Sequence, residues 1–166
     1  MKKPGQANIS QEEENLILEN IDKFIDRDIR PNVSDLEHKD IYPTEIVEKM
    51  KQLGLFGATI SSEYGGLGLP ITTYSKIVER ISAAWMSVSG IINSHLIMAA
   101  AVERHGTKEQ KDYYLPKFAS GEIEIGACHE HGCVGSVAGI YTASMPVFVV
   151  ENRTFGNRGF CNFYEG

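Results

Sequence analysis

The sequence predicts a mainly α-helical protein, a helical bundle followed by a short β-prone C-terminal segment. Apolar residues recur at helical spacing between residues 10 and 121, and capping residues stand at the ends of several of these patterns. A stretch without charged residues, 81–102, lies among them. Residues 127–166 differ in kind, because they hold only five of the 38 charged side chains and contain two short runs typical of strands. We therefore divide the chain into a helical domain, 1–126, and a second segment, 127–166.

The first predicted helix begins at a capping box. Ser10 is followed three residues later by Glu13, so each side chain can accept a hydrogen bond from the other residue's backbone N–H. Arg30-Pro31 ends the helical pattern, since proline disfavours the helical conformation at the residue before it. The apolar face of this helix consists of Ile17, Ile21, Phe24, Ile25 and Ile29.

The second predicted helix begins at Pro43-Thr44 and ends at Gly54. Glu45 lies in its first turn, where a negative charge stabilises the helix dipole, and Gly54 can adopt the left-handed conformation that closes a helix. The residues that we expect this helix to bury are Ile46, Val47, Met50 and Leu53.

Two more helices are predicted on either side of the uncharged stretch. One runs from Pro70 to about Ala83, and its apolar face consists of Ile71, Tyr74, Ile77, Val78 and Ile81. The other opens with a second capping box, Thr107 with Gln110, and ends near Gly121 after passing through Lys111, Tyr114 and Leu115.

The uncharged stretch 81–102 has the length of a membrane-spanning helix, which needs about 20 apolar residues. It also contains several serines together with Asn93 and His95, lacks flanking basic clusters, and is interrupted at Gly90. We therefore favour the central helix of the bundle, surrounded by the others, over a membrane span.

Composition excludes several classes of protein. A chain of 166 residues with 42% hydrophobic residues can build the core of one ordinary domain. The net charge of -6, with no basic run longer than Lys2-Lys3, speaks against a nucleic-acid binder. Residues 1–15 lack the apolar core of a secretory signal, and the three cysteines, an odd number, suit reduced thiols. We expect a cytoplasmic or mitochondrial-matrix protein.

Two separated motifs resemble the acyl-CoA dehydrogenase family. The first consists of Gly-Leu-Phe-Gly at 54–57 and Ser-Glu-Tyr-Gly-Gly-Leu-Gly at 62–68, and it resembles the family's signature loop between its second and third helices. The second begins with His-Gly-Thr-Lys-Glu-Gln-Lys at 105–111 and continues with Tyr-Leu-Pro at 114–116 and Ala-Ser-Gly-Glu at 119–122. It is similar to the family's late helical segment. The resemblance covers roughly residues 10–126 and implies the family's all-helical N-terminal domain.

This resemblance implies FAD-dependent α,β-dehydrogenation of an acyl-CoA thioester, with an electron-transfer flavoprotein as partner and a homo-oligomer as a compatible assembly. In the family the helical domain is one wall of the active site. A carboxylate of the C-terminal domain removes the α-proton while hydride leaves the β-carbon for flavin N5. No residue of this chain corresponds to that carboxylate, so we assign no catalytic residue here and expect the chain to be inactive alone.

The resemblance weakens at the start of the family's β-domain. The family continues through Thr-Glu-Pro and Gly-Ser-Asp, which contact flavin and acyl-CoA, whereas residues 129–133 are His-Glu-His-Gly-Cys and only Gly135-Ser136 matches. The resemblance thus implies one cofactor-binding residue, Ser136, and a partial, divergent β-domain segment over 127–166. The alternative function is a non-catalytic helical interaction module from a truncated gene.

Two other features invite a functional interpretation. Glycines 65, 66 and 68 suggest a phosphate loop, but no strand precedes them and no Lys-Ser or Lys-Thr follows, so we favour a turn that packs the helical domain. Residues 128–133 concentrate two cysteines and two histidines, yet their spacing matches no common zinc finger, and we predict no metal site.

His95 is the remaining candidate in the apolar stretch. By the family resemblance, the helix that carries it borders the acyl-chain pocket, and the imidazole could face that pocket. We favour a hydrogen-bonded core histidine instead, because buried polar side chains are generally paired.

Overall fold

The described part of the chain, residues 5–124 of a computed structural model, is built from helices. The α-helices are α1 (Gln11–Phe24), α2 (Val33–His38), α3 (Thr44–Gln52), α4 (Ile71–Ala84), α5 (Met86–His105) and α6 (Lys108–Ser120), with a π-helical turn at Ile25–Ile29 and 3₁₀ turns at Leu55–Gly57 and Ser62–Tyr64. The predicted mainly α fold is confirmed for these residues. The predicted β-prone segment lies outside them.

Both predicted capping boxes are confirmed. At the start of α1, the Glu13 backbone N–H donates to Ser10 Oγ at 3.2 Å and the Ser10 N–H donates to the Glu13 carboxylate at 2.7 Å. At the start of α6, Thr107 and Gln110 make the equivalent pair of bonds at 3.3 and 2.9 Å. These helix starts could be read from the sequence because each needs only residues three positions apart.

Two helix ends depend on glycine in the left-handed conformation. Gly54, which follows α3, has φ 71°, and Gly121, which follows α6, has φ 74°. A side chain would be strained at such angles, whereas glycine adopts them readily. The predicted ends of both helices are therefore confirmed.

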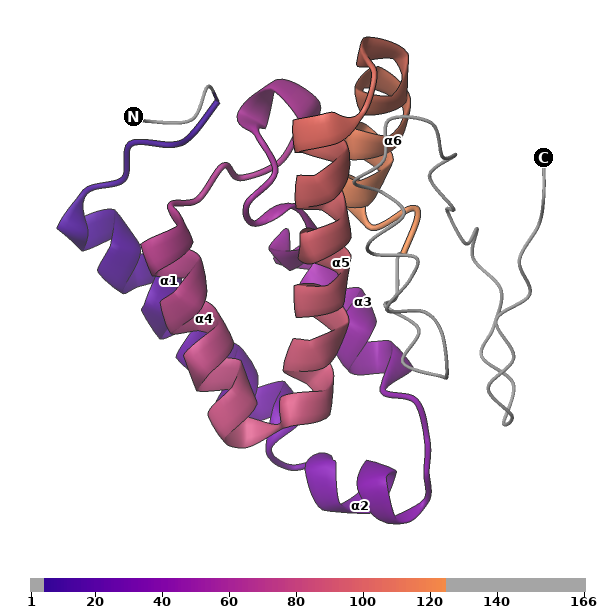
Figure 1. Cartoon of the computed structure of the whole chain (residues 1–166). Coiled ribbons are helices and arrows are strands. Elements are labelled where there is room, and N and C mark those ends of the chain that lie inside the picture. Colours follow the sequence, from indigo (N-terminus) through magenta and orange to yellow (C-terminus); the bar gives the residue numbers. More distant parts are fainter. Residues whose placement is uncertain (1–4, 125–166) are drawn as a thin grey trace.

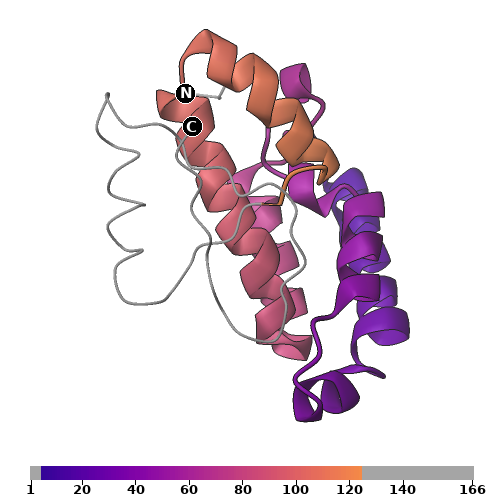
Figure 2. The ribbon, with the colours of Figure 1, turned by 90° about the vertical axis from the view of Figure 1, so that its right-hand side faces the viewer.

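The helices are arranged around a corner between α4 and α5, from which the two diverge (Figure 1). α1 lies beside α4, where Lys76 forms an ion pair with Glu14 at 2.6 Å. The short helix α2 lies at the lower end of the molecule in both ribbon views (Figures 1 and 2). There the indole N–H of Trp85 donates to the Glu37 carboxylate at 2.6 Å and so joins α2 to the corner.

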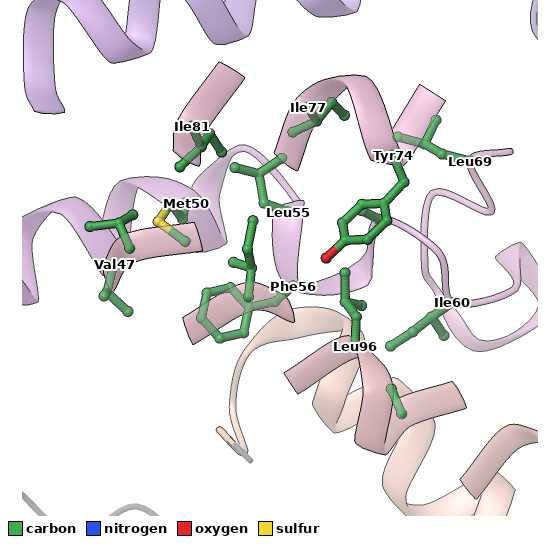
Figure 3. Packing of buried hydrophobic residues seen from close by; sticks show 14 of the residues in the cluster. Val47, Met50, Leu55, Phe56, Ile60, Leu69, Tyr74, Ile77, Ile81 and Leu96 are labelled. Carbon is green, nitrogen blue, oxygen red and sulfur yellow. The ribbon is translucent and has the colours of Figure 1, made fainter. Parts of the chain in front are cut away.

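One hydrophobic core fills the space between the helices (Figure 3). Its buried side chains come mainly from α1, α3, α4, α5 and α6, and Val33 and Leu36 of α2 are partly buried and pack against it. The largest fully buried side chains of the described residues are Phe56, Phe118, Ile29, Met50, Ile60, Ile77, Ile81, Ile92, Leu115, His95, Val47 and Val88. Phe56 and Ile60 belong to the loop after α3, so this loop is part of the core and not a surface connection.

Most residues in the middle of the predicted apolar faces are buried or partly buried, but two residues at the ends of these faces are exposed. Leu53, expected to be buried, is 41% exposed, and Ile71 is 64% exposed. Leu53 lies just past the last residue of α3, and Ile71 is the first residue of α4. Both stand at the end of a helix, where the packing against other helices stops. Helix α2 was not predicted at all, because its six residues bury none of their side chains.

The uncharged stretch forms the end of α4 and most of α5, with the break at Trp85 and not at the predicted Gly90. α5 is long and apolar enough to cross a membrane by length and composition alone, with a mean hydropathy of 1.2. It packs against α4 and α6 in this structure, but only 44% of that window is buried. Within residues 5–124, α5 is therefore a core helix on one side only, and these residues do not surround it on all sides as expected.

Gly90 should be replaceable with a gain in stability. It lies inside α5, is exposed, and a Cβ built on it would meet nothing within 4 Å. We expect Gly90→Ala to raise the free energy of unfolding by about 0.5–1 kcal/mol, since alanine loses less backbone entropy in a helix. Urea denaturation followed by far-UV circular dichroism measures this change. A loss of stability would contradict the prediction and would indicate that another surface contacts α5 at this position.

Candidate functional site

The glycine-rich loop between α3 and α4 is the first candidate site, and its backbone is internally paired. Every backbone N–H from Gly65 to Leu69 donates to a carbonyl oxygen of residues 57–62, at distances of 2.7 to 3.2 Å. A phosphate-binding loop presents such N–H groups to its ligand. The loop is therefore a packing turn, as favoured from the sequence.

Close approach explains two of the glycines in this loop. A Cβ on Gly66 would lie 2.2 Å from the carbonyl oxygen of Ile60, and a Cβ on Gly57 would lie 3.0 Å from the carbonyl oxygen of Ala119 in α6. The loop thus folds tightly on itself and packs onto α6 through its backbone. The family-like motif at 54–68 serves the packing of the helical domain.

His95 is the second candidate, and it is a core residue. Its side chain is fully buried, and Nε2 lies 3.0 Å from the carbonyl oxygen of Phe118. Its ring meets Phe56 edge to face, with 4.8 Å between the ring centroids, and Phe118 at 5.8 Å. Burial lowers the pKa of His95 to about 4, although the backbone hydrogen bonds to Phe118 and Phe56 oppose this shift. The imidazole is thus neutral at pH 7, and the preferred interpretation from the sequence is confirmed.

Carboxylates are the third class of candidate. A general base works best with a pKa near the working pH. Hydrogen bonds to Lys76 and Thr73 lower the pKa of Glu14 to about 2, and hydrogen bonds to Arg27 and Lys49 lower that of Asp28. The same direction holds for the other two carboxyl groups of residues 5–124 with a resolved shift, Glu13 and Glu109. These carboxylates stabilise the fold and are poor bases.

The exposed stripe of α5 is a surface feature that the sequence did not predict. It consists of Met86, Gly90, Asn93, Ile97 and Arg104, all exposed and all on one face of the helix. Met86 is 75% exposed and Ile97 is 53% exposed. The sequence did not reveal the stripe because α5 has apolar residues on its buried and on its exposed face, so hydrophobic periodicity cannot separate the two. Gly90 and Asn93 were the two residues within the uncharged stretch that mark this face as different.

A polar contact at the middle of this stripe orients one of its residues. The Tyr74 hydroxyl of α4 donates to Asn93 Oδ1 at 3.2 Å. Burial raises the pKa of Tyr74 to about 12, so this hydroxyl keeps its proton at neutral pH. The contact joins α4 to α5 and leaves the apolar residues of the stripe uncovered by the described residues.

The remaining sequence candidates lie outside the described residues. These are the predicted cofactor-binding residue Ser136 and the cysteine and histidine cluster of 128–133. Within residues 5–124, no group of three or more His, Cys, Asp or Glu side chains could hold a metal ion. The predictions for 127–166 thus remain predictions.

Comparison with known proteins separates the chain into two parts. Residues 11–122 match the family model described as acyl-CoA dehydrogenase, N-terminal domain. Residues 123–166 match a different one, described as oxamate carbamoyltransferase subunit AllG. The two matches meet where the helical domain ends.

Individual relatives agree with the first match. The short-chain specific acyl-CoA dehydrogenase of Clostridium acetobutylicum is 34% identical over 121 residues, which are 72% of this chain and 31% of the relative. Butyryl-CoA dehydrogenase from Megasphaera elsdenii has a similar fold, with a TM-score of 0.64 and 24% identity over 72% of this chain and 32% of that one. A chain from a structural study of the electron transferring flavoprotein of Acidaminococcus fermentans also has a TM-score of 0.64, with 25% identity over 70% of this chain and 31% of that chain. This chain therefore spans about a third of the length of these relatives.

Proposed function

Since this chain belongs to the acyl-CoA dehydrogenase family through an N-terminal helical domain in residues 11–122, we propose that this domain forms one wall of an acyl-CoA binding site. The observation that supports this proposal is the exposed stripe of α5. An acyl chain is apolar and gains free energy by leaving water, so it needs an apolar surface. Met86 and Ile97 supply such a surface, and Gly90 between them leaves room beside the helix.

The family reaction is FAD-dependent α,β-dehydrogenation, which needs a base and a flavin on opposite faces of the acyl chain. Among the described residues, the four carboxyl groups with a resolved pKa shift are poor bases because each shift is downward, and His95 is fully buried in the core. The glycine loop offers no N–H group to a flavin phosphate, because its N–H groups from Gly65 to Leu69 are bonded to its own carbonyl oxygens. The helical domain binds and orients the acyl group, and the chemical groups that react come from elsewhere.

A domain replacement tests this proposal. In the Clostridium acetobutylicum relative, the segment matched by residues 11–122 is exchanged for this chain's own residues, and dehydrogenation of a short-chain acyl-CoA is measured. We expect the hybrid to bind flavin and to retain activity. Ile97→Asp in the hybrid should then raise KM or abolish turnover while the flavin content stays unchanged.

Leu16→Asp is the matched control for this experiment. Leu16 is 57% exposed on α1, close to the 53% of Ile97, but it lies off the stripe. Its replacement should leave KM and turnover unchanged. If the two aspartate variants behave alike, the stripe is not the wall that contacts the acyl group.

The isolated chain should bind FAD weakly or not at all and should not dehydrogenate acyl-CoA. The reason is that the glycine loop has no N–H group left for a flavin phosphate, and that the carboxyl groups with resolved pKa shifts are poor bases. The purified chain is incubated with excess FAD, desalted, and examined by its flavin absorbance, then assayed with an artificial electron acceptor. A stoichiometric yellow protein would contradict this. So would turnover that survives repurification and disappears in Glu130→Gln, since Glu130 is the first carboxylate in the divergent segment 127–166.

A second candidate function follows from the match of residues 123–166 to the oxamate carbamoyltransferase subunit. In this case the helical domain is joined to a segment of another family and serves as a non-catalytic interaction module. The coding sequence beyond codon 126, read in all three frames, separates the candidates. A Thr-Glu-Pro in another frame would support a disrupted dehydrogenase, whose electron acceptor would be an electron-transfer flavoprotein. A continuous carbamoyltransferase-like frame would support the module.

A further inference from the structure

The residues that follow α6, at the end of the helical domain, contact other parts of this domain. Past Gly121 the chain turns back, and Ile123 is 3% exposed with its backbone N–H donating to the carbonyl oxygen of Lys117 at 3.2 Å. The next residue, Glu124, uses its two carboxylate oxygens separately. Oε1 lies 2.6 Å from Lys51 Nζ, and Oε2 accepts from the Tyr42 hydroxyl at 3.4 Å.

Lys51 is the central member of this cluster. Its side chain is 14% exposed and also pairs with Glu48 at 2.7 Å. Burial disfavours its charge, but the hydrogen bonds to Glu124 and Glu48 outweigh burial and raise the pKa of Lys51. The ammonium group therefore stays charged and bonded to both carboxylates.

Gly121 makes room for this lysine. A Cβ on Gly121 would lie 2.7 Å from Lys51 Cγ and 3.0 Å from its Cδ, so the aliphatic stem runs directly over the glycine. The ammonium group lies 6.0 Å from the ring centroid of Phe56, a core residue. Gly121 thus has two roles. It ends α6, and its missing side chain leaves room for the Lys51 side chain to pass over it and reach Glu124.

We propose that Tyr42, Lys51 and Glu124 form a clamp that fixes the point at which the chain leaves the helical domain. Tyr42 and Lys51 belong to the part that matches the dehydrogenase family, whereas Ile123 and Glu124 belong to the part that matches the carbamoyltransferase subunit. The clamp therefore joins residues from the two sides of the boundary. All three are positioning residues, and the clamp does not depend on whether the chain takes part in catalysis.

Amide hydrogen exchange on the full chain, measured by NMR, tests the clamp. Glu124→Gln keeps the shape of the side chain and removes its charge. We expect the Ile123 amide to exchange about tenfold faster in this variant, because a charge-assisted contact that holds the turn is lost. Amides in the middle of α6 should be unchanged, since they donate to carbonyl oxygens within the helix itself. Lys51→Met should have the same effect on Ile123, and the double variant should add nothing further.

Glu122→Gln is the matched control. Glu122 is 64% exposed and lies 3.7 Å from Lys117, so it is an acidic neighbour outside the clamp. Its replacement should leave the exchange of the Ile123 amide unchanged. The proposal is overturned if Glu124→Gln changes that exchange less than about twofold, or if Glu122→Gln accelerates it equally.

Discussion

Gly66→Ala should destabilise the helical domain by at least about 3 kcal/mol. The added Cβ would lie 2.2 Å from the carbonyl oxygen of Ile60 and 2.7 Å from its carbonyl carbon. Both are backbone atoms of a fully paired loop, so relief would require breaking hydrogen bonds between the two halves of that loop. Urea denaturation at pH 7, followed by far-UV circular dichroism, measures the loss.

Gly65→Ala is the matched control one residue away. Gly65 has φ 81°, and a Cβ there would meet nothing within 4 Å. This substitution introduces only left-handed strain, which costs about 1–2 kcal/mol. If both alanine variants lose the same free energy of unfolding, backbone strain and not close approach explains the glycine motif, and the account given for Gly66 is wrong.

Acidification from pH 7 to pH 5 should lower the free energy of unfolding by about 2 kcal/mol through His95 alone. The pKa of His95 is about 4 in the folded protein, below its ordinary value of 6.5, so the unfolded chain binds the proton first. Its contribution to stability is complete above pH 6.5 and is lost as the pH falls from 6.5 to 4, reaching about 3 kcal/mol.

Between pH 7 and pH 5, the change in stability due to His95 is separated from the change due to the carboxylates. Groups such as Glu14 and Asp28, whose pKa values are lowered in the folded protein, lose their contribution only below about pH 4.5. In His95→Gln, the slope of stability against pH in this window should flatten, whatever the absolute stability. His105→Gln, a change at an exposed histidine, should keep the wild-type slope. An unchanged slope in His95→Gln would refute the assignment.

The sequence predicted best those features that depend on neighbouring residues. The capping boxes at Ser10 and Thr107 and the glycine ends at Gly54 and Gly121 need only local geometry, and all four were located. Helix α2 was missed because tertiary contacts, such as that between Trp85 and Glu37, hold it in place. Sequence pattern alone carries no information on such a contact.

The site was harder to predict than the fold. α5 is apolar nearly all round, so its hydrophobic pattern could not tell a buried face from an exposed one. The exposed stripe with Met86 and Ile97 became visible only once the positions of α4 and α6 were known. His95 could be assigned to the core because buried polar side chains are generally paired. Its two aromatic neighbours could not be predicted, because Phe56 and Phe118 lie 39 and 23 residues away in the sequence.

The corner between α4 and α5 gives the protein an internal optical probe. Trp85 is the single tryptophan of the chain, 6% exposed, and its indole N–H is bonded to α2. Its fluorescence therefore reports on the docking of α2, whereas circular dichroism reports on all helices together. Early red-shifted emission in a denaturation experiment, before ellipticity falls, would be the spectroscopic signature of α2 detaching from an otherwise folded domain.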